Sequence, residues 1–307
     1  MFFNLPTLLT WARIVAIPLV IGIFYLPAEP ATVRSLADYL ALGAQDRALT
    51  VLPAHYSYGL SVINSHLYAG STLVLDDVSV LSTRFAQTMR EQAVSSIAGV
   101  PSTYQMLHRT GFHLQDFPAL RTLTQAGGRL DDKLTGIFAR TAAERGWRFF
   151  VMYGQTEGTA RISYVPPDML LAKIGAIGVA IPGGQLALDP DSQEILYRGP
   201  NVMMGYATGP GDLARGDDLQ GVLRTGDLGR RDPDGLYYVT GRLKRILKIA
   251  GNRVSLDDVE DQLQQALGCP AAVGGRDERM VIWLEAPDPA VADAAKQLLS
   301  SRYGLHH

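Results

Sequence analysis

Helix-like and strand-like stretches alternate between residues 32 and 166, and this order limits the fold more than any other feature of the sequence. Runs such as "RALTVLP", "SSIAGVP" and "WRFFVMYG" have the pattern of buried strands. Stretches with helical periodicity, such as "TRFAQTMREQAV" and "DDKLTGIFARTAAERG", lie between such runs. Strands that alternate with helices predict parallel strands joined by crossover helices. We therefore predict an α/β fold.

The sequence pattern changes twice after this region. After Pro166 the chain is rich in glycine and in short strands, and "DPDG" at residues 232–235 predicts a tight turn, so we expect a small β-rich subdomain packed on the α/β part. From Lys244 onward a strand, a helix with Ser255 as its N-cap, another strand and a last helix predict a small α+β unit. The predicted domains are an apolar segment at residues 1–27, a large domain at 28–243 and a C-terminal subdomain at 244–307.

The first 27 residues are almost entirely apolar, with Arg13 as the single charged side chain. As a helix, the run from Leu8 to Leu26 would be roughly 28 Å long, close to the thickness of a hydrocarbon core of about 30 Å. Trp11 and Tyr25 suit the two membrane interfaces, and no positive region precedes the run as in a secretory signal. We predict that residues 1–27 associate with a membrane, by spanning it or by lying in its interface. A buried hydrophobic helix is the alternative.

Charge and cysteine content exclude several classes of function. The formal net charge is −2 and the isoelectric point about 6.3, so no basic surface argues for a nucleic-acid partner. Cys269 is the single cysteine, which excludes an internal disulfide and a cysteine-cluster zinc site and fits a reducing compartment.

Each motif taken alone is only weakly specific for a function. Thr156 and Glu157 could form a surface turn, "RTGD" at residues 224–227 could be a hairpin corner, and "AGG" at 126–128 could be any strand end. Their order is far more specific. The chain contains in succession "LPAHYSYGL", "QAGG", "MYGQTEG", "GAIGVAIPGG", "YRGPNVMMGY", "LRTGDLG" and "GRLKRILKIAGNRVSLDDVE".

This series resembles the adenylate-forming superfamily of acyl-CoA synthetases, adenylation domains and luciferases, over residues 32 to 307. The resemblance implies activation of a carboxylic acid by ATP and Mg²⁺ to an acyl adenylate. It also implies transfer of the acyl group to CoA or to the phosphopantetheine thiol of an acyl-carrier protein. With such chemistry the protein is expected in the cytoplasm or on the cytoplasmic face of a membrane.

The resemblance also implies roles for individual residues. The adenine would lie against Tyr153 and Gly154 and the backbone of Ala126, Gly127 and Gly128. Asp227 would accept hydrogen bonds from the ribose hydroxyls, and Arg242 would lie near the ribose or the α-phosphate. Thr156 would donate to phosphate oxygens, and Glu157 would hold Mg²⁺, a hard cation that prefers oxygen ligands.

Three further residues match positions of the family pattern. His55 would close the carboxylate pocket, with a helix-start histidine as the alternative, and "GVPSTYQML" at residues 99–107 would line the acyl pocket. Lys244 would be the hinge about which the C-terminal unit rotates between half-reactions. Lys248 would serve the second step, with a solvated strand lysine as the alternative.

Parts of the family pattern are missing. Upstream of residue 50 the chain has no Ser/Thr/Gly-rich loop ending in Pro-Lys to bind the outer phosphates, and "AGST" at residues 69–72 lacks that lysine. The C-terminal Ser-Gly-Lys loop and the first half of the family's sheet are also absent. Residues 1–27 instead resemble the N-terminus of a bacterial phosphatidylglycerophosphate synthase, without the catalytic signature of those phosphatidyltransferases further along.

We therefore expect an acyl-adenylate-forming ligase with an incomplete large domain and a truncated C-terminal subdomain, impaired because it lacks a phosphate clamp and a cation for developing charge. One alternative is a non-catalytic, membrane-tethered module that binds AMP or an acyl adenylate. Others are a rearrangement product without a stable fold and, on the N-terminal segment alone, a phosphatidyltransferase.

Overall fold

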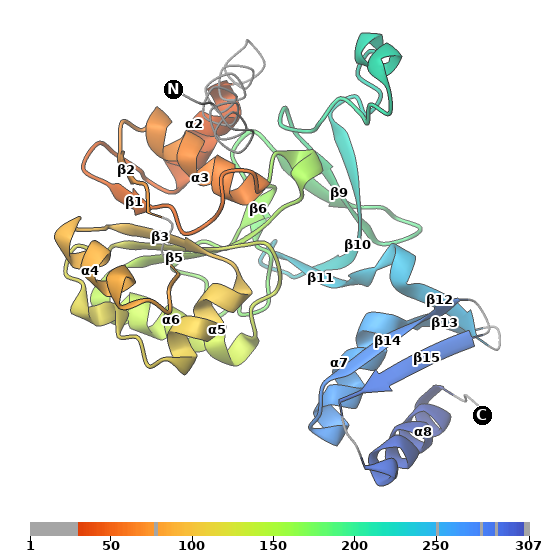
Figure 1. Cartoon of the computed structure of the whole chain (residues 1–307). Helices are drawn as coiled ribbons and strands as arrows, with labels where there is room; N and C mark the ends of the chain where they lie inside the picture. The colour runs from red at the N-terminus through yellow and green to blue at the C-terminus, as the bar shows by residue number, and fades with distance from the viewer. Residues whose placement is uncertain (1–29, 77–78, 250–251, 277–278, 286–287, 304–307) are drawn as a thin grey trace, which may run out of the picture. The chain divides into compact units, whose positions relative to one another are not determined.

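The computed structural model describes residues 30–76, 79–249, 252–276, 279–285 and 288–303 (Figure 1). Contacts within the chain divide it into two compact units. The first unit holds the described residues up to Leu186 together with Tyr197–Leu223 and Asp232–Tyr237. The second unit holds Ala187–Leu196, Arg224–Arg231 and the described residues from Tyr238 onward.

A seven-stranded sheet forms the centre of the first unit, in the order β2-β1-β3-β4-β5-β6-β7. The first five strands along the chain pair in parallel and the last two in antiparallel fashion. Because β3 and β4 are buried along their whole length, their side chains fill both faces of the sheet. The predicted α/β fold is confirmed. The strands are β1 (Arg47–Leu49), β2 (Thr72–Val74), β3 (Ser96–Gly99), β4 (Thr122–Gln125), β5 (Arg148–Tyr153), β6 (Ser163–Tyr164) and β7 (Val179–Ala180).

Helices form at "TRFAQTMREQAV" and "DDKLTGIFARTAAERG", where the sequence periodicity predicts them, and also at residues 57–68 and 101–109, where no helix was predicted. The Asp131 side chain accepts a hydrogen bond from Leu134 N (3.1 Å) and caps the helix that Gly146 ends in the left-handed conformation (φ 68°). Ser82 caps another helix by accepting from Arg84 N (3.2 Å). The helices of this unit are α2 (Pro30–Tyr39), α3 (Ser57–Tyr68), α4 (Thr83–Glu91), α5 (Pro101–Arg109) and α6 (Asp132–Arg145), with the short 3₁₀ turns η1 (Leu114–Asp116), η2 (Thr156–Gly158) and η3 (Pro210–Ala214).

Helix α3 buries more polar side chains than the other helices of this unit. Ser61, Asn64 and Ser65 are all less than one-tenth exposed, and they stand next to Tyr58 and Val62 of the apolar core. The two serine hydroxyls donate to backbone carbonyls one turn earlier in the helix. A helix with such a face is suited to hold a polar loop in the interior.

The glycine-rich region forms a second sheet in the order β11-β10-β9-β8. The turn predicted at "DPDG" joins two of its strands, and there Leu236 N donates to Asp232 Oδ1 (2.9 Å) and Gly235 N to Asp232 O (3.0 Å). Lys173 Nζ donates to Asp232 Oδ2 (2.8 Å) and also contacts Asp234, so an ion pair fixes the turn within the first unit. The strands are β8 (Gln185–Leu188), β9 (Glu194–Arg198), β10 (Val222–Arg231) and β11 (Tyr237–Arg242).

The C-terminal part contains the two predicted helices. Each of its two predicted strands forms a hairpin with a further strand that the sequence did not predict. Ser255 caps its first helix by accepting from Asp258 N (3.3 Å), and Val259 and Leu263 of that helix are fully buried in a separate apolar core. The elements are η4 (Leu243–Arg245), β12 (Ile246–Ile249), β13 (Asn252–Ser255), α7 (Leu256–Leu267), β14 (Ala271–Arg276), β15 (Arg279–Leu284) and α8 (Pro289–Tyr303). The domain boundary predicted at Lys244 falls in η4 and stays a prediction.

The predicted membrane segment, residues 1–27, lies outside the described residues. In the ranges that the structure describes, none of the helices combines the length and the apolar character needed to cross a bilayer.

Two glycines of the first unit offer a test of how tightly the sheet edge is packed. Gly183 is the third residue of a turn closed by Gly184 N and Ile181 O (2.9 Å), with φ 86° and open space around it. Gly178 has nearly the same φ (84°), but a Cβ there would overlap the carbonyl of Tyr164.

We expect Gly183→Ala to lower the free energy of unfolding by about 1 kcal/mol, from left-handed strain alone. Gly178→Ala adds a backbone clash to the same strain and should cost roughly 3 kcal/mol. Urea unfolding followed by circular dichroism measures both, and equal losses in the two variants would contradict the close approach.

Candidate functional site

The site residues of the first unit lie at the carboxyl ends of its parallel strands. Ala126–Gly128 follow β4, Tyr153 ends β5 and Thr156–Glu157 follow it, and His55 lies between β1 and α3. Carboxyl ends of parallel strands meet at one edge of a sheet, where ligands of α/β proteins bind. The topology therefore brings together four sequence-predicted segments that are up to about 100 residues apart in the chain.

Two glycines after β4 present bare backbone at this edge. Gly127 has φ 78°, and a Cβ there would overlap the Tyr56 hydroxyl. Gly128 has φ 151°, with Pro101 Cγ 3.2 Å from where its Cβ would be. The side-chain amide of Gln125 donates to Gly128 O (2.8 Å) and stabilises the backbone conformation of the two glycines. Both glycines are exposed, so a flat ligand could approach their peptide groups closely.

The loop after β5 is folded back tightly on itself. Ala160 N donates to Gln155 O (2.9 Å), and both Thr159 and Ala160 are left-handed (φ 53° and 68°). A Cβ at Gly154 would overlap the Ala160 carbonyl, so only glycine allows this closure. We name residues 154–161 the β5 loop. Its tip presents the exposed Thr156 and the half-buried Glu157.

Helix α3 holds the β5 loop on one side. The hydroxyls of Ser57 and Thr156 are hydrogen-bonded (3.1 Å), and one helical turn later Ser61 Oγ accepts from Arg161 Nε (3.1 Å). Ser57 and Ser61 are four residues apart and therefore share a face of the helix. The helix thus contacts the loop near both of its ends.

Arg161 anchors the loop in the interior. Arg161 is 1% exposed. Its guanidinium donates to Tyr39 OH (3.2 Å) and lies over the Tyr58 ring (5.2 Å to the centroid). Burial raises the pKa of Tyr58 and of Tyr39, so both phenols are neutral partners of this cation at physiological pH. Sequence reasoning missed Arg161; a charged side chain inside the otherwise apolar run "ARISYV" was the available signal.

The segment after β9 holds the β5 loop on its other side. Asn201 Nδ2 donates to the carbonyls of Gly158 (2.7 Å) and Arg161 (3.0 Å), and Met203 N donates to Glu157 O (2.8 Å). Tyr206 OH donates to the Glu157 carboxylate at Oε1. This side of the loop was also missed, although its residues belong to the motif "YRGPNVMMGY".

In the second unit, Asp227 and Arg242 form an ion pair between β10 and β11. Arg242 Nε donates to Asp227 Oδ1 (3.0 Å); the Asp227 side chain is 5% exposed and that of Arg242 67%. A buried carboxylate bound to an exposed guanidinium is fixed in place while the cation remains open to ligands. Lys244 lies in η4 and Lys248 in β12, which agrees with the strand predicted for Lys248.

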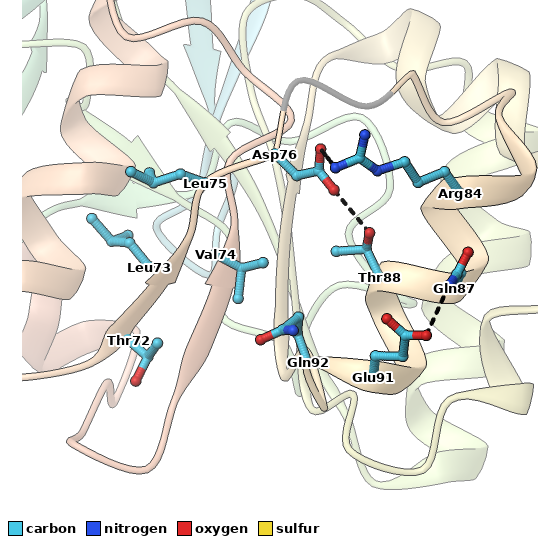
Figure 2. Close-up of a pocket in the computed structure, with 10 residues that line it drawn as sticks. All are labelled: Thr72, Leu73, Val74, Leu75, Asp76, Arg84, Gln87, Thr88, Glu91 and Gln92. Carbon is cyan, nitrogen blue, oxygen red and sulfur yellow. Dashed lines mark hydrogen bonds and ion pairs between the residues drawn. The ribbon is translucent and has the colours of Figure 1, made fainter.

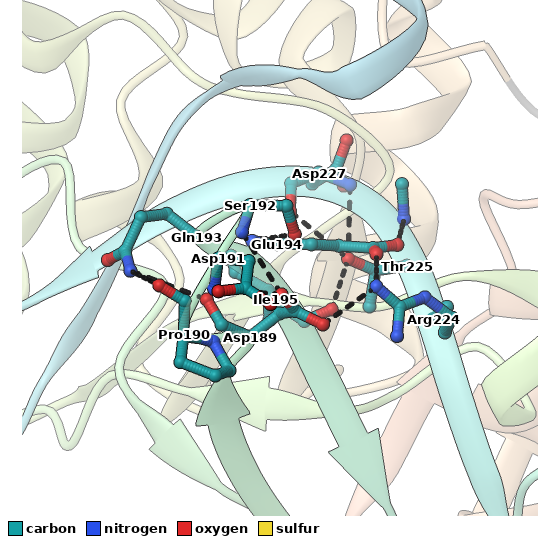
Figure 3. A network of polar contacts seen from close by, with 11 residues as sticks. Asp189, Pro190, Asp191, Ser192, Gln193, Glu194, Ile195, Arg224, Thr225 and Asp227 are labelled. Carbon is teal, nitrogen blue, oxygen red and sulfur yellow. Dashed lines mark hydrogen bonds and ion pairs between the residues drawn. The ribbon is translucent and has the colours of Figure 1, made fainter.

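A network of polar contacts surrounds the part of strand β10 that carries Asp227 (Figure 3). Gly226 has φ 74°, and its N–H donates to Glu194 Oε1 (2.8 Å). Thr225 Oγ1 donates to Ile195 O (2.8 Å). Arg224 pairs with Glu194 (2.6 Å) and with Asp189 (2.9 Å). These contacts hold a bend inside β10 and so set the position of the carboxylate that follows.

Comparison with known proteins identifies the family. Residues 30–207 match the family model described as "AMP-binding enzyme". The chain belongs to this family. It is 30% identical over 256 residues to indoleacetate–CoA ligase of Aromatoleum aromaticum, a match that covers 79% of this chain and 49% of the relative. It is 28% identical over 245 residues to the medium-chain fatty-acid–CoA ligase of Escherichia coli, covering 76% of this chain and 43% of the relative.

Solved structures of AMP-binding enzymes share the fold. The unliganded o-succinylbenzoate CoA synthetase of Bacillus subtilis superposes with a TM-score of 0.70 at 25% identity, covering 87% of this chain and 60% of that one. The same synthetase in complex with ATP and a magnesium ion gives a TM-score of 0.68 at 26% identity, covering 87% and 58%. The predicted superfamily is confirmed, and the chain spans about half the length of the curated relatives it matches.

The oxygen donors at the tip of the β5 loop fit the magnesium ion expected in this family. Within the described ranges, groups of three or more His, Cys, Asp or Glu side chains that could hold a metal are absent. Mg²⁺ does not require such a group, because it keeps several waters and binds through one or two carboxylates plus substrate phosphates. The half-buried Glu157 carboxylate and the exposed Thr156 hydroxyl are of the right chemistry.

The remaining predicted residue of the first unit, His55, is exposed in the turn before α3. His66 of the same helix differs, since burial lowers its pKa and its Nδ1 lies 2.8 Å from Val62 O. His55 is therefore the histidine of this region that is open to a ligand.

A pocket of about 540 Å³ lies elsewhere in the first unit, between the edge strand β2 and α4 (Figure 2). Asp76 lies at its mouth and binds Thr88 Oγ1 (2.8 Å) and Arg84 (3.2 Å). None of the residues predicted for the nucleotide site line it.

The hydrogen bonds that Asp189 accepts in the second unit predict that the stability of the fold depends on pH in the acid range. The pKa of Asp189 is lowered to about 2, because the Ser192 backbone N–H and the Arg224 side chain donate to its carboxylate. A lowered pKa in the folded chain stabilises the fold at pH values above the unfolded pKa of about 4, and this contribution is lost as pH falls toward 2.

We expect Asp189→Asn to melt at a lower temperature than the parent at pH 7 and the two melting curves to converge as pH falls toward 2. Asp191→Asn, at an exposed neighbouring position, is the matched control and should follow the parent throughout. A constant difference between Asp189→Asn and the parent at all pH values would contradict the role assigned to the ionised carboxylate.

Proposed function

We propose that this chain binds an adenine nucleotide at the carboxyl ends of β4 and β5 and takes part in forming an acyl adenylate. The acyl group then passes to the thiol of CoA or of a phosphopantetheine carrier. The observation that carries this proposal is the β5 loop, which two separate parts of the first unit hold with a hydroxyl and a carboxylate at its tip. Membership of the AMP-binding family supports the same chemistry.

The adenine is assigned to the bare backbone after β4. A purine ring needs a flat surface and peptide groups at its edge, and the exposed Gly127 and Gly128 offer both next to the buried Ala126. Tyr153 and Gly154, at the end of β5, would provide the opposite wall with an aromatic face. These assignments follow the order of motifs in the sequence.

The phosphates are assigned to the tip of the β5 loop. Thr156 would donate its hydroxyl to a phosphate oxygen, and Ser57, its partner at 3.1 Å, would keep that hydroxyl in orientation. Glu157 would hold Mg²⁺, which when bound neutralises phosphate charge and eases the departure of pyrophosphate. Preorganised oxygen donors need no rearrangement when the reaction occurs.

In the reaction, a carboxylate oxygen of the acid attacks the α-phosphorus and the bond to pyrophosphate breaks. In the second step a thiolate attacks the acyl carbon and AMP leaves. His55, exposed before α3, is assigned to the end of the acid that carries the carboxylate. The segment "GVPSTYQML", residues 99–107, which includes most of α5, is assigned to the acyl chain.

The order of motifs also assigns roles to residues of the second unit. Asp227 is assigned to the ribose hydroxyls and Arg242, its exposed partner, to the ribose or the α-phosphate. Lys244 would act as the hinge between the two steps and Lys248 in the thiol-transfer step. The relatives named above are CoA ligases, which supports CoA as the acceptor.

Nucleotide binding by the whole chain tests the proposal. We expect AMP and a non-hydrolysable acyl-adenylate analogue to raise the melting temperature, and Asp227→Asn to weaken binding of both by roughly tenfold or more through loss of a charged acceptor. Isothermal titration measures the affinities, and Asp191→Asn in the same unit is the control that should bind as the parent does.

Pyrophosphate exchange with a panel of carboxylic acids then separates an enzyme from a binding module. Exchange that depends on the acid supports ligase chemistry. Binding of AMP without any exchange would identify a non-catalytic nucleotide-binding protein. A parent chain whose melting and titration respond to neither nucleotide would overturn the proposed function.

A further inference from the structure

Glu157 receives two hydrogen bonds from a short segment that follows β9. Met203 N donates to its backbone carbonyl (2.8 Å), and Tyr206 OH donates to its carboxylate at Oε1. The two donors are three residues apart, so the main chain and the side chain of Glu157 are held by the same piece of structure. Within the described ranges the other carboxylate oxygen, Oε2, accepts no hydrogen bond.

This segment is itself attached to the interior. Asn201 Oδ1 accepts a hydrogen bond from Tyr197 OH (2.7 Å), and Tyr197 is completely buried, which raises its pKa to about 12 and keeps it a neutral donor. The side-chain amide of Asn201 donates to two backbone carbonyls of the β5 loop. The backbone carbonyl of Asn201 accepts a hydrogen bond from Thr159 Oγ1 (2.8 Å). The segment that carries Tyr206 is therefore held in place at Asn201 by buried hydrogen bonds.

A free carboxylate on a loop samples several rotamers, and fixing a glutamate side chain costs about 1.5–2 kcal/mol of conformational entropy. A phenol that binds one oxygen removes most of that freedom before any metal arrives. The second oxygen stays open for a cation. Residues that orient a ligating carboxylate in this way tune metal affinity without touching the metal.

From this geometry we propose that Tyr206 is a positioning residue, whose hydroxyl orients the Glu157 carboxylate so that its free oxygen binds Mg²⁺ together with the nucleotide phosphates. The inference rests on the proposed function and adds to it a residue to which the order of motifs assigns no role. Tyr206 is 66% exposed, so its ring contributes little to the core and its removal should leave the fold intact.

The test is the linkage between Mg²⁺ and ATP in Tyr206→Phe, which removes the hydroxyl and keeps the ring. Titration calorimetry gives the affinity for ATP with saturating Mg²⁺ and with EDTA, and the ratio of the two is the enhancement due to the metal. We expect this enhancement to fall about tenfold in the variant. Affinity for AMP in EDTA should stay unchanged, which a general loss of structure would not allow.

Two controls accompany the variant. Tyr68→Phe removes an exposed phenol at the end of α3 and should keep the full enhancement. Glu157→Gln should abolish the enhancement, and combining it with Tyr206→Phe should cause no further loss, because the hydroxyl acts only through the carboxylate.

The outcomes separate this inference from the proposed function. Full enhancement in Tyr206→Phe would overturn the positioning role, as would a parent chain that binds AMP but gains nothing from Mg²⁺, and both would leave the nucleotide site standing. A parent chain that binds no nucleotide would overturn the proposed function, and this inference with it.

Discussion

The hydrogen bonds that hold the β5 loop from both sides are the constraint on which the rest of the site depends. Without them the loop would have to keep two left-handed non-glycine residues, Thr159 and Ala160, against their local preference. Helix α3 and the segment after β9 supply the partners, and the absence of a side chain at Gly154 lets the loop close. Ser61 is the buried polar side chain of α3 that serves this task, because its hydroxyl accepts a hydrogen bond from Arg161.

The β5 loop of the first unit and the part of β10 around Asp227 in the second unit are held by different kinds of contact. The first relies on neutral partners: the buried guanidinium of Arg161 is surrounded by hydroxyls and an aromatic face. The second relies on charge, with Arg224 joining two carboxylates below the bend that carries Asp227. Exposed ion pairs of the second kind contribute little to stability at high salt. A hydrogen-bonded interior of the first kind is insensitive to salt but intolerant of losing a partner.

The sequence alone predicted the fold class well, because buried parallel strands and amphipathic helices have periods that a single chain displays. It also predicted the capping of α7 by Ser255 and the turn at residues 232–235, which depend on local chemistry. The strand-end positions of Ala126–Gly128 and Thr156–Glu157 followed from motif order, whereas their functional roles remain predictions. The sequence did not predict the long-range contacts of Arg161, Asn201 and Tyr206. The partners in these contacts lie 40 to 122 residues away, and no local sequence pattern indicates a side-chain pair at that separation.

The attachment of the β5 loop to residues 201–206 also bears on how the protein is made. A ribosome releases the strands β1 to β5 and the helices between them well before it reaches Asn201. The parallel sheet can therefore begin to form while the β5 loop still lacks its hydrogen bonds to residues 201–206. Contacts between distant parts of the chain form slowly. The β5 loop should consequently reach its final form late in biosynthesis, with Glu157 fixed in orientation only after Tyr206 has left the ribosome.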